Sequence, residues 1–121
     1  MAIKNILIVD DSATDRQFLS EVLSKNGFKV ATADSAEDAM LKVKQSRPDL
    51  VLMDIVLPGQ NGFQATRALS RDESTKHIPV ILCTSKNQET DRVWGLRQGA
   101  RDYIAKPINQ AELLAKISAL G

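Results

Sequence analysis

The sequence predicts an α/β domain built around a doubly wound parallel sheet. Short runs of aliphatic and β-branched residues alternate strictly with longer stretches whose apolar residues recur at helical spacing. Glycine, asparagine and proline end most of the longer stretches. Alternation of this kind is typical of strand–helix–strand units with right-handed crossovers. The length of 121 residues corresponds to one domain, which we expect to span residues 1–121.

Five runs are predicted to be strands. The first, third and fourth are nearly continuous Ile, Leu and Val, which is typical of strands covered on both faces. The second and fifth are more mixed, as expected for edge strands. In chain order the runs are Asn5–Asp10, Phe28–Ala33, Leu50–Asp54, Pro79–Thr84 and Arg101–Ala105.

Five amphipathic stretches, one after each strand, are predicted to be helices. Ser12, followed three residues later by Asp15, fits a helix start with a capping box. Asn26-Gly27, Pro48 and Gly99 lie where the first, second and fourth helices should end. The residues expected to face inward are Phe18, Leu19, Val22 and Leu23; Ala36, Ala39, Met40 and Val43; Ala65, Ala68 and Leu69; Glu89, Val93 and Leu96; and Leu113, Leu114, Ile117 and Leu120.

Composition and charge exclude several classes of protein. Sixteen basic and fifteen acidic residues leave a net charge of +1, which offers no overall attraction for nucleic acid or an anionic membrane. The one cysteine excludes an intrachain disulfide, and the one histidine excludes a site that needs two. No apolar run approaches the ~18 residues of a membrane span, and residues 1–5 lack the features of a signal peptide. We therefore expect a cytoplasmic protein that neither binds nucleic acid nor inserts into a membrane.

Polar residues follow four of the five predicted strands. Asp10 and Asp11 come after the first, Asp54 after the third, Thr84 at the end of the fourth and Lys106 after the fifth. Ligands of open α/β sheets bind beyond the carboxyl ends of the strands, where the strand order reverses. We therefore expect these side chains to meet at one edge of the sheet.

Carboxylates gathered in this way need a compensating charge. Two unit charges about 5 Å apart repel by roughly 3 kcal/mol at an effective dielectric constant near 20. An all-oxygen set of ligands selects a hard cation, Mg²⁺ or Mn²⁺, and Mg²⁺ commonly completes its shell with water and phosphate oxygens. Asp54 is the candidate nucleophile, because a carboxylate can attack phosphorus to form an acyl phosphate. Lys106 and the Thr84 hydroxyl can then bind phosphoryl oxygens.

Each of these residues alone has an ordinary explanation. The Asp10-Asp11 pair could cap a helix, Asp54 could sit in a turn, Thr84 could cap a helix and Lys106 could be solvated. The functional interpretation depends on all of these side chains lying at the same edge of the sheet.

Three further residues stand out, and each is better explained by structure. Cys83 lies in an apolar strand and is expected to be a buried, unreactive thiol. His77 has no partner in sequence that would orient it. Trp94 is expected to pack in the core, with a role as an anchor for a partner as the alternative.

Four motifs now identify a family. They are ILIVDDS (Ile6–Ser12), LVLMDIVLPGQNG (Leu50–Gly62), PVILCTS (Pro79–Ser85) and YIAKP (Tyr103–Pro107). In this order and spacing, the chain resembles the receiver domain of two-component response regulators of the stand-alone, CheY-like kind. The stretches QATR and ETDRVWGLRQGARDY are similar to regulators of the type IV pilus and twitching-motility branch.

The resemblance implies a flavodoxin-like fold with strand order 2-1-3-4-5. It implies that Asp54 accepts the phosphoryl group and that Asp10, Asp11 and Asp54, with the backbone carbonyl of Val56, hold Mg²⁺. The remaining residues that it assigns are Thr84 and Tyr103 as switch residues, Lys106 as the lysine of the family motif, and a cis peptide bond between Lys106 and Pro107.

The resemblance also implies partners. The phosphoryl donor would be a sensor histidine kinase of the chemotaxis (CheA) type. After phosphorylation Thr84 would move, Tyr103 would turn inward, and a downstream protein would read the face made by the fourth helix, fifth strand and fifth helix. No output domain fits within 121 residues, so the signal would leave by protein contact. The protein would be a monomer or a weak phosphorylation-dependent dimer, and would catalyse only its own phosphorylation and dephosphorylation.

Two other functions stay open. A haloacid-dehalogenase-like phosphatase or phosphotransferase would also use Asp54, but such enzymes usually carry a second Asp two residues later, where this chain has Val56. A pseudo-receiver would bind partners without phosphorylation, which the intact set of acidic, hydroxyl and lysine residues argues against. A flavin site on the same fold is disfavoured, because Asp10 and Asp11 would repel the flavin phosphate.

Overall fold

The computed structural model describes residues 3–86 and 88–120 of the chain. Within them, a five-stranded parallel sheet has the strand order β2-β1-β3-β4-β5. The predicted fold class and the strand order implied by the family resemblance are both confirmed. The strands are β1 (Asn5–Val9), β2 (Lys29–Ala33), β3 (Leu50–Met53), β4 (Val80–Thr84) and β5 (Asp102–Ala105).

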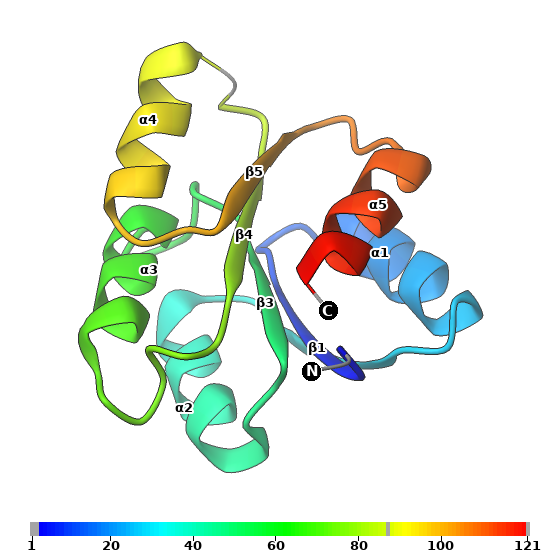
Figure 1. Ribbon diagram of the computed structural model, residues 1–121, viewed down its shortest axis with the longest axis horizontal. Helices are drawn as coiled ribbons and strands as arrows, with labels where there is room; N and C mark the ends of the chain where they lie inside the picture. The colour runs from blue at the N-terminus through cyan, green and yellow to red at the C-terminus, as the bar shows by residue number, and fades with distance from the viewer. Residues whose placement is uncertain (1–2, 87, 121) are drawn as a thin grey trace.

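Helices cover both faces of the sheet (Figure 1). One side carries α1 and α5, and the other carries α2, α3 and α4. Their bounds in the described residues are α1 (Ala13–Lys25), α2 (Ala36–Ser46), α3 (Gly62–Arg71), α4 (Glu89–Arg97) and α5 (Gln110–Leu120).

The sheet separates two apolar cores. Alternate side chains of each central strand point to opposite faces, so Leu7 and Val51 join the core beneath α2, α3 and α4. Ile6 and Ile8 join the core beneath α1 and α5. All three central strands are buried almost throughout, and the two mixed runs are the edge strands, as the sequence predicted.

The inward face predicted for α4 is wrong. Val93 and Leu96 are 39% and 36% exposed, and Trp94, expected in the core, is 49% exposed. The buried residue of this helix is Gly95, where an added Cβ would lie 2.4 Å from Leu82 Cδ1. The helix therefore contacts the sheet through a residue without a side chain, which leaves its apolar side chains near the surface.

The start of α1 differs from a full capping box. Ser12 Oγ accepts a hydrogen bond from the Asp15 amide at 3.2 Å, as a helix cap should. The Ser12 amide, however, donates to Asp10 Oδ1 rather than to the Asp15 side chain. Phe18, expected to face inward on this helix, is 44% exposed.

The start of α3 is pressed against the loop after β3. A capping box between Asn61 and Gln64, which the sequence analysis did not identify, fixes this end of the helix. The Gly62 amide donates to the Ile55 carbonyl at 2.8 Å, and an added Cβ at Gly62 would lie 2.0 Å from the Asp54 carbonyl oxygen. Only glycine permits this approach without moving the backbone of residue 54.

We predict that Gly62→Ala lowers the free energy of unfolding by about 2–3 kcal/mol, because the new methyl group must displace backbone atoms. Denaturant unfolding measures this loss. Gly27→Ala is the matched control: the position has a positive φ of 88°, but nothing lies within 4 Å of an added Cβ, so its cost should stay near 1 kcal/mol. Equal losses in the two variants would contradict the close approach.

Candidate functional site

Acidic residues meet where β1 and β3 end. Val9 pairs with Met53 in the parallel register, so the residues that follow, Asp10 and Asp54, are neighbours. The Asp54 amide donates to the Val9 carbonyl at 2.9 Å and holds the two chain segments together. Asp10, Asp11 and Asp54 each offer a carboxylate oxygen within 4.8 Å of the others. The predicted convergence of these side chains is what the structure shows.

Two of these carboxylates are buried. Asp10 is 2% exposed and Asp54 6%, whereas Asp11 is exposed to solvent. Burial raises the pKa of Asp10, and the charge of Asp54 raises it further. Hydrogen bonds from Lys106 and from the Ser12 amide oppose this shift without cancelling it. Burial thus makes the ionised form of Asp10 costly in this site.

Lys106 places a positive charge directly beside these carboxylates. Its Nζ lies 2.7 Å from Asp10 Oδ2, 2.8 Å from Asp15 Oδ2 and 3.1 Å from Asp54 Oδ2. Burial lowers the pKa of Lys106, but the hydrogen bonds to these carboxylates outweigh it and raise the pKa. The Lys106 amide donates to the Thr84 carbonyl at 2.9 Å, and the Lys106–Pro107 peptide bond is cis.

Asp15 is a site residue that the sequence analysis missed. Its position after Ser12 suggested a helix cap, and its amide does make the cap hydrogen bond. Its carboxylate, however, points to Lys106. The available signal was its place in the first turn of the helix that follows Asp10, which keeps it near the same edge of the sheet.

The Asp54 carboxylate is held on both sides. Oδ1 accepts a hydrogen bond from the Ile55 amide at 2.7 Å, and Oδ2 accepts one from Lys106. Val56 follows two residues later with a side chain that is 55% exposed. The carboxylate is thus oriented by its surroundings and lies beside an exposed loop residue.

Thr84 and Tyr103, the two predicted switch residues, are both buried. Thr84 is fully buried at the end of β4, and its Oγ1 accepts a hydrogen bond from the Lys86 amide at 3.2 Å. Tyr103 is 8% exposed, so its ring is buried in this conformation, and its inward turn on phosphorylation stays a prediction. Burial raises the pKa of Tyr103 to about 12, and its hydroxyl has no hydrogen-bond partner among the described residues.

Cys83 is a structural residue, as expected. It is buried in β4, and burial raises the pKa of its thiol to about 12. The thiol therefore stays protonated at neutral pH and is a poor nucleophile.

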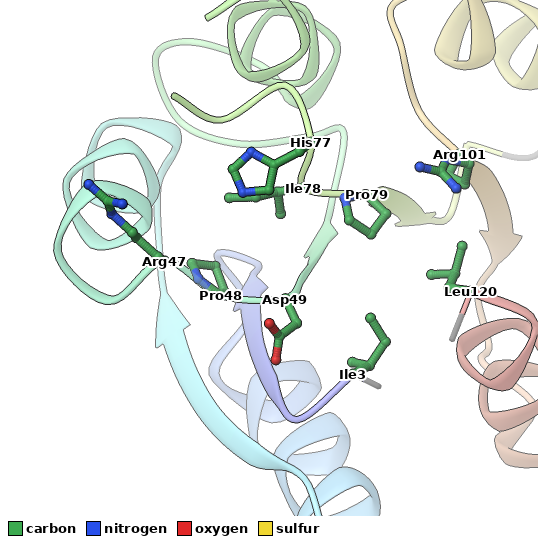
Figure 2. A pocket seen from close by; sticks show the side chains of 9 residues that line it. All are labelled: Ile3, Arg47, Pro48, Asp49, His77, Ile78, Pro79, Arg101 and Leu120. Carbon is green, nitrogen blue, oxygen red and sulfur yellow. The ribbon is translucent and has the colours of Figure 1, made fainter. Parts of the chain in front are cut away.

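His77 lines a cavity at the opposite end of the molecule (Figure 2). The cavity has a volume of about 300 Å³, and its lining includes Arg47, Asp49 and Arg101. The Asp49 carboxylate is already used: it accepts hydrogen bonds from the Lys4 and Asn5 amides at 2.9 Å, which lower its pKa. This cavity lies at the amino ends of the strands, away from the acidic cluster, and Asp49 there ties β1 to the loop before β3.

The acidic cluster fits a hard divalent cation. Its donors are carboxylate oxygens from Asp10, Asp11 and Asp54, and the described residues that form the cluster include no histidine or cysteine. Such a set of ligands suits Mg²⁺ or Mn²⁺ better than zinc or copper. Because Asp10 and Asp54 are both buried, an additional cation would offset part of the cost of keeping two carboxylates out of water.

Comparison with known proteins identifies the family. The family model described as the response regulator receiver domain matches residues 6–118. The chain belongs to this family. The resemblance drawn from the four sequence motifs is therefore confirmed, and the family is one of signalling proteins rather than a classical enzyme family.

Curated relatives include both short and long receiver proteins. The chain is 54% identical over 115 residues to protein PilH of Pseudomonas aeruginosa, with 95% of each chain covered. It is 41% identical over 117 residues to the phosphate regulon transcriptional regulatory protein PhoB of Escherichia coli, covering 97% of this chain and 51% of PhoB. This receiver domain thus spans nearly all of PilH but about half of PhoB.

Solved structures share the architecture in full. Chemotaxis protein CheY4 of Vibrio cholerae superposes with a TM-score of 0.91 at 28% identity, covering 99% of this chain and 100% of that one. The BeF3-activated receiver domain of RstA from Klebsiella pneumoniae gives a TM-score of 0.87 at 30% identity, covering 96% and 97%. In residues 3–86 and 88–120 of this chain, no helix has the length and apolar character that a bilayer crossing requires.

We predict that Asp10→Asn raises the thermal unfolding midpoint of the metal-free protein. A raised pKa means that the folded state binds a proton more tightly than the unfolded chain, so ionised Asp10 is destabilising. The same destabilisation should fade in the unsubstituted protein as the pH falls through the folded-state pKa toward the ordinary value of 3.8. Calorimetry in a chelator measures both effects. Asp34→Asn, which neutralises an exposed carboxylate after β2, should leave the midpoint nearly unchanged; a lower midpoint for Asp10→Asn would contradict the explanation.

Proposed function

We propose that this receiver domain accepts a phosphoryl group on Asp54 from the phosphohistidine of a sensor histidine kinase. The observation that carries the proposal is the buried Asp54 carboxylate, which shares a 4.8 Å cluster with Asp10 and Asp11 and contacts the Lys106 ammonium. Asp10, Asp11 and Asp54, with the backbone carbonyl of Val56, would hold Mg²⁺, and Mn²⁺ could replace it. When bound, the cation would neutralise charge on the incoming phosphoryl group.

The transfer itself is a displacement at phosphorus. An Asp54 carboxylate oxygen attacks in line as the bond between phosphorus and the donor imidazole nitrogen breaks, and the electron pair of that bond stays on the nitrogen. The Ile55 amide already orients one Asp54 oxygen. Lys106 exchanges its contact with the other oxygen for one with a phosphoryl oxygen, and the buried Thr84 hydroxyl offers a second donor. The protein thus catalyses its own phosphorylation and, with water as the nucleophile, its own dephosphorylation.

The output is a change in a protein-binding face. Thr84 ends β4, and its carbonyl accepts a hydrogen bond from the amide of Lys106, which follows β5. A shift of Thr84 toward the phosphoryl group would therefore move the end of β5. α4, one element of the proposed face made by α4, β5 and α5, exposes Val93 and Trp94, which gives a partner protein apolar surface to contact. Phosphorylation would shift the population between two conformers of this face.

We place this single domain, residues 1–121, in a cytoplasmic, motility-type phosphorelay. The donor would be a kinase of the CheA type, and a downstream protein would read the output face. The similarity to PilH over 95% of both chains and to CheY4 over the full length supports this placement. We expect neither nucleic-acid binding nor membrane insertion, and a monomer or a weak dimer that forms on phosphorylation.

Two other functions predict different chemistry at the same carboxylate. A haloacid-dehalogenase-like enzyme would turn over small phosphate esters through a transient Asp54 phosphoenzyme. A pseudo-receiver would not be phosphorylated at all. Val56, at the position where such an enzyme usually carries its second Asp, disfavours the enzyme. The intact set of Asp10, Asp11, Asp54, Thr84 and Lys106 disfavours the pseudo-receiver.

Incubation with acetyl phosphate and Mg²⁺ tests the proposal. We predict stoichiometric, base-labile incorporation of phosphate, detected as a mass increase of the intact protein. Asp54→Asn should abolish it, and Asp34→Asn, another carboxylate that follows a strand but lies exposed outside the cluster, should retain it. Continuous release of phosphate from small esters would favour the enzyme, and the absence of any incorporation would favour the pseudo-receiver.

A further inference from the structure

We propose that Asp15 is a positioning residue that gives the Lys106 ammonium a carboxylate partner outside the metal-binding cluster. This inference rests on the proposed function, because it concerns how the site holds a divalent cation and an ammonium together. It assigns a role to a residue whose sequence context suggested only a helix cap.

The Lys106 ammonium contacts three carboxylates, two of which a bound cation would also need. An ammonium group has three N–H donors, and here Nζ lies within hydrogen-bond distance of Asp10, Asp15 and Asp54, at 2.7, 2.8 and 3.1 Å. Asp10 and Asp54 belong to the cluster that could hold a metal ion, whereas Asp15 does not. The same two carboxylates are therefore shared between Lys106 and any cation bound by the cluster.

Burial makes this sharing costly for the ammonium. The Lys106 side chain is 16% exposed, so water alone would poorly replace a lost carboxylate partner. The Asp15 side chain is 42% exposed, and it lies in the first turn of α1, where a negative charge is favourable. Asp15 can therefore keep its contact with Lys106 when a cation binds the Asp10 carboxylate.

Loss of Asp15 should weaken metal binding. Without it, Lys106 is left with Asp10 and Asp54 alone and competes more strongly with the cation for them. We expect Asp15→Asn to weaken Mg²⁺ binding by about threefold to tenfold, in the range of a partly exposed charge-assisted hydrogen bond. Asp15→Glu, which restores a carboxylate, should recover most of the affinity.

Titration calorimetry of the full chain with Mg²⁺ measures these affinities. Glu21→Gln is the matched control, because it removes one negative charge from the same helix, where the side chain contacts Gln17 instead of Lys106. Its affinity should match that of the unsubstituted protein. An Asp15→Asn affinity equal to that of this control would overturn the proposal.

A double-mutant cycle with Lys106→Met separates positioning from simple charge. If Asp15 acts through Lys106, then Asp15→Asn should change Mg²⁺ affinity little in the Lys106→Met background. An equal loss in both backgrounds would mean that Asp15 acts only as a nearby negative charge, and would overturn the proposal.

A second measurement avoids the Lys106 substitution, in case that variant fails to fold. The ¹⁵N-labelled lysine ammonium groups can be observed by NMR when hydrogen bonds slow their exchange with water. With saturating Mg²⁺, the Lys106 signal should persist in the unsubstituted protein and be lost in Asp15→Asn. Persistence in both proteins would contradict the role of Asp15 as the retained partner.

The two proposals fail in distinguishable ways. If the unsubstituted protein binds no Mg²⁺ and takes up no phosphate, the proposed function is wrong, and the role of Asp15 is wrong with it. If it does both and Asp15→Asn behaves like Glu21→Gln, only the role of Asp15 is wrong.

Discussion

The ion pairs between Lys106 and the buried carboxylates are the interaction on which the functional edge of the sheet depends. Asp10 and Asp54 are removed from water at the ends of adjacent strands, and Lys106 reaches both from the end of β5. An ionised carboxylate that is buried without a partner is strongly destabilising. The Lys106 ammonium balances part of the negative charge that the fold buries at this edge.

The sheet topology makes this arrangement possible. Asp10 and Lys106 are 96 residues apart in the chain, and the parallel order of the strands brings their ends to the same edge. Gly62 sets α3 directly against the Asp54 backbone, and the Ile55 amide donates to the Asp54 carboxylate. Asp54 is therefore contacted by α3, by its own loop and by Lys106. A change of charge at Asp54 has a direct physical route to Lys106, and through the Lys106 amide to Thr84.

Much of the fold and most of the site could be predicted from the sequence, for a physical reason. Strands buried on both faces read as continuous aliphatic runs, and polar residues at their carboxyl ends must meet because the strands are parallel. Asp15 was missed because its spacing from Ser12 has an ordinary local explanation, and only the fold shows where its carboxylate points. The exposure of Val93 could not be predicted because periodicity does not reveal that α4 contacts the sheet through Gly95. The exposure of Trp94 fits the alternative interpretation of that residue rather than the expected core packing. The burial of Tyr103 depends on the packing of side chains from several elements, which no local pattern encodes.

We expect this edge of the sheet to place a phosphoryl group on one particular carboxylate among several. Reduction of the phosphorylated protein with borohydride tests it directly, since an aspartyl phosphate is converted to homoserine, which peptide mass spectrometry locates. The account predicts homoserine at position 54 and unmodified aspartate at positions 10, 11 and 15. Homoserine at one of those three positions, or at none, would contradict it.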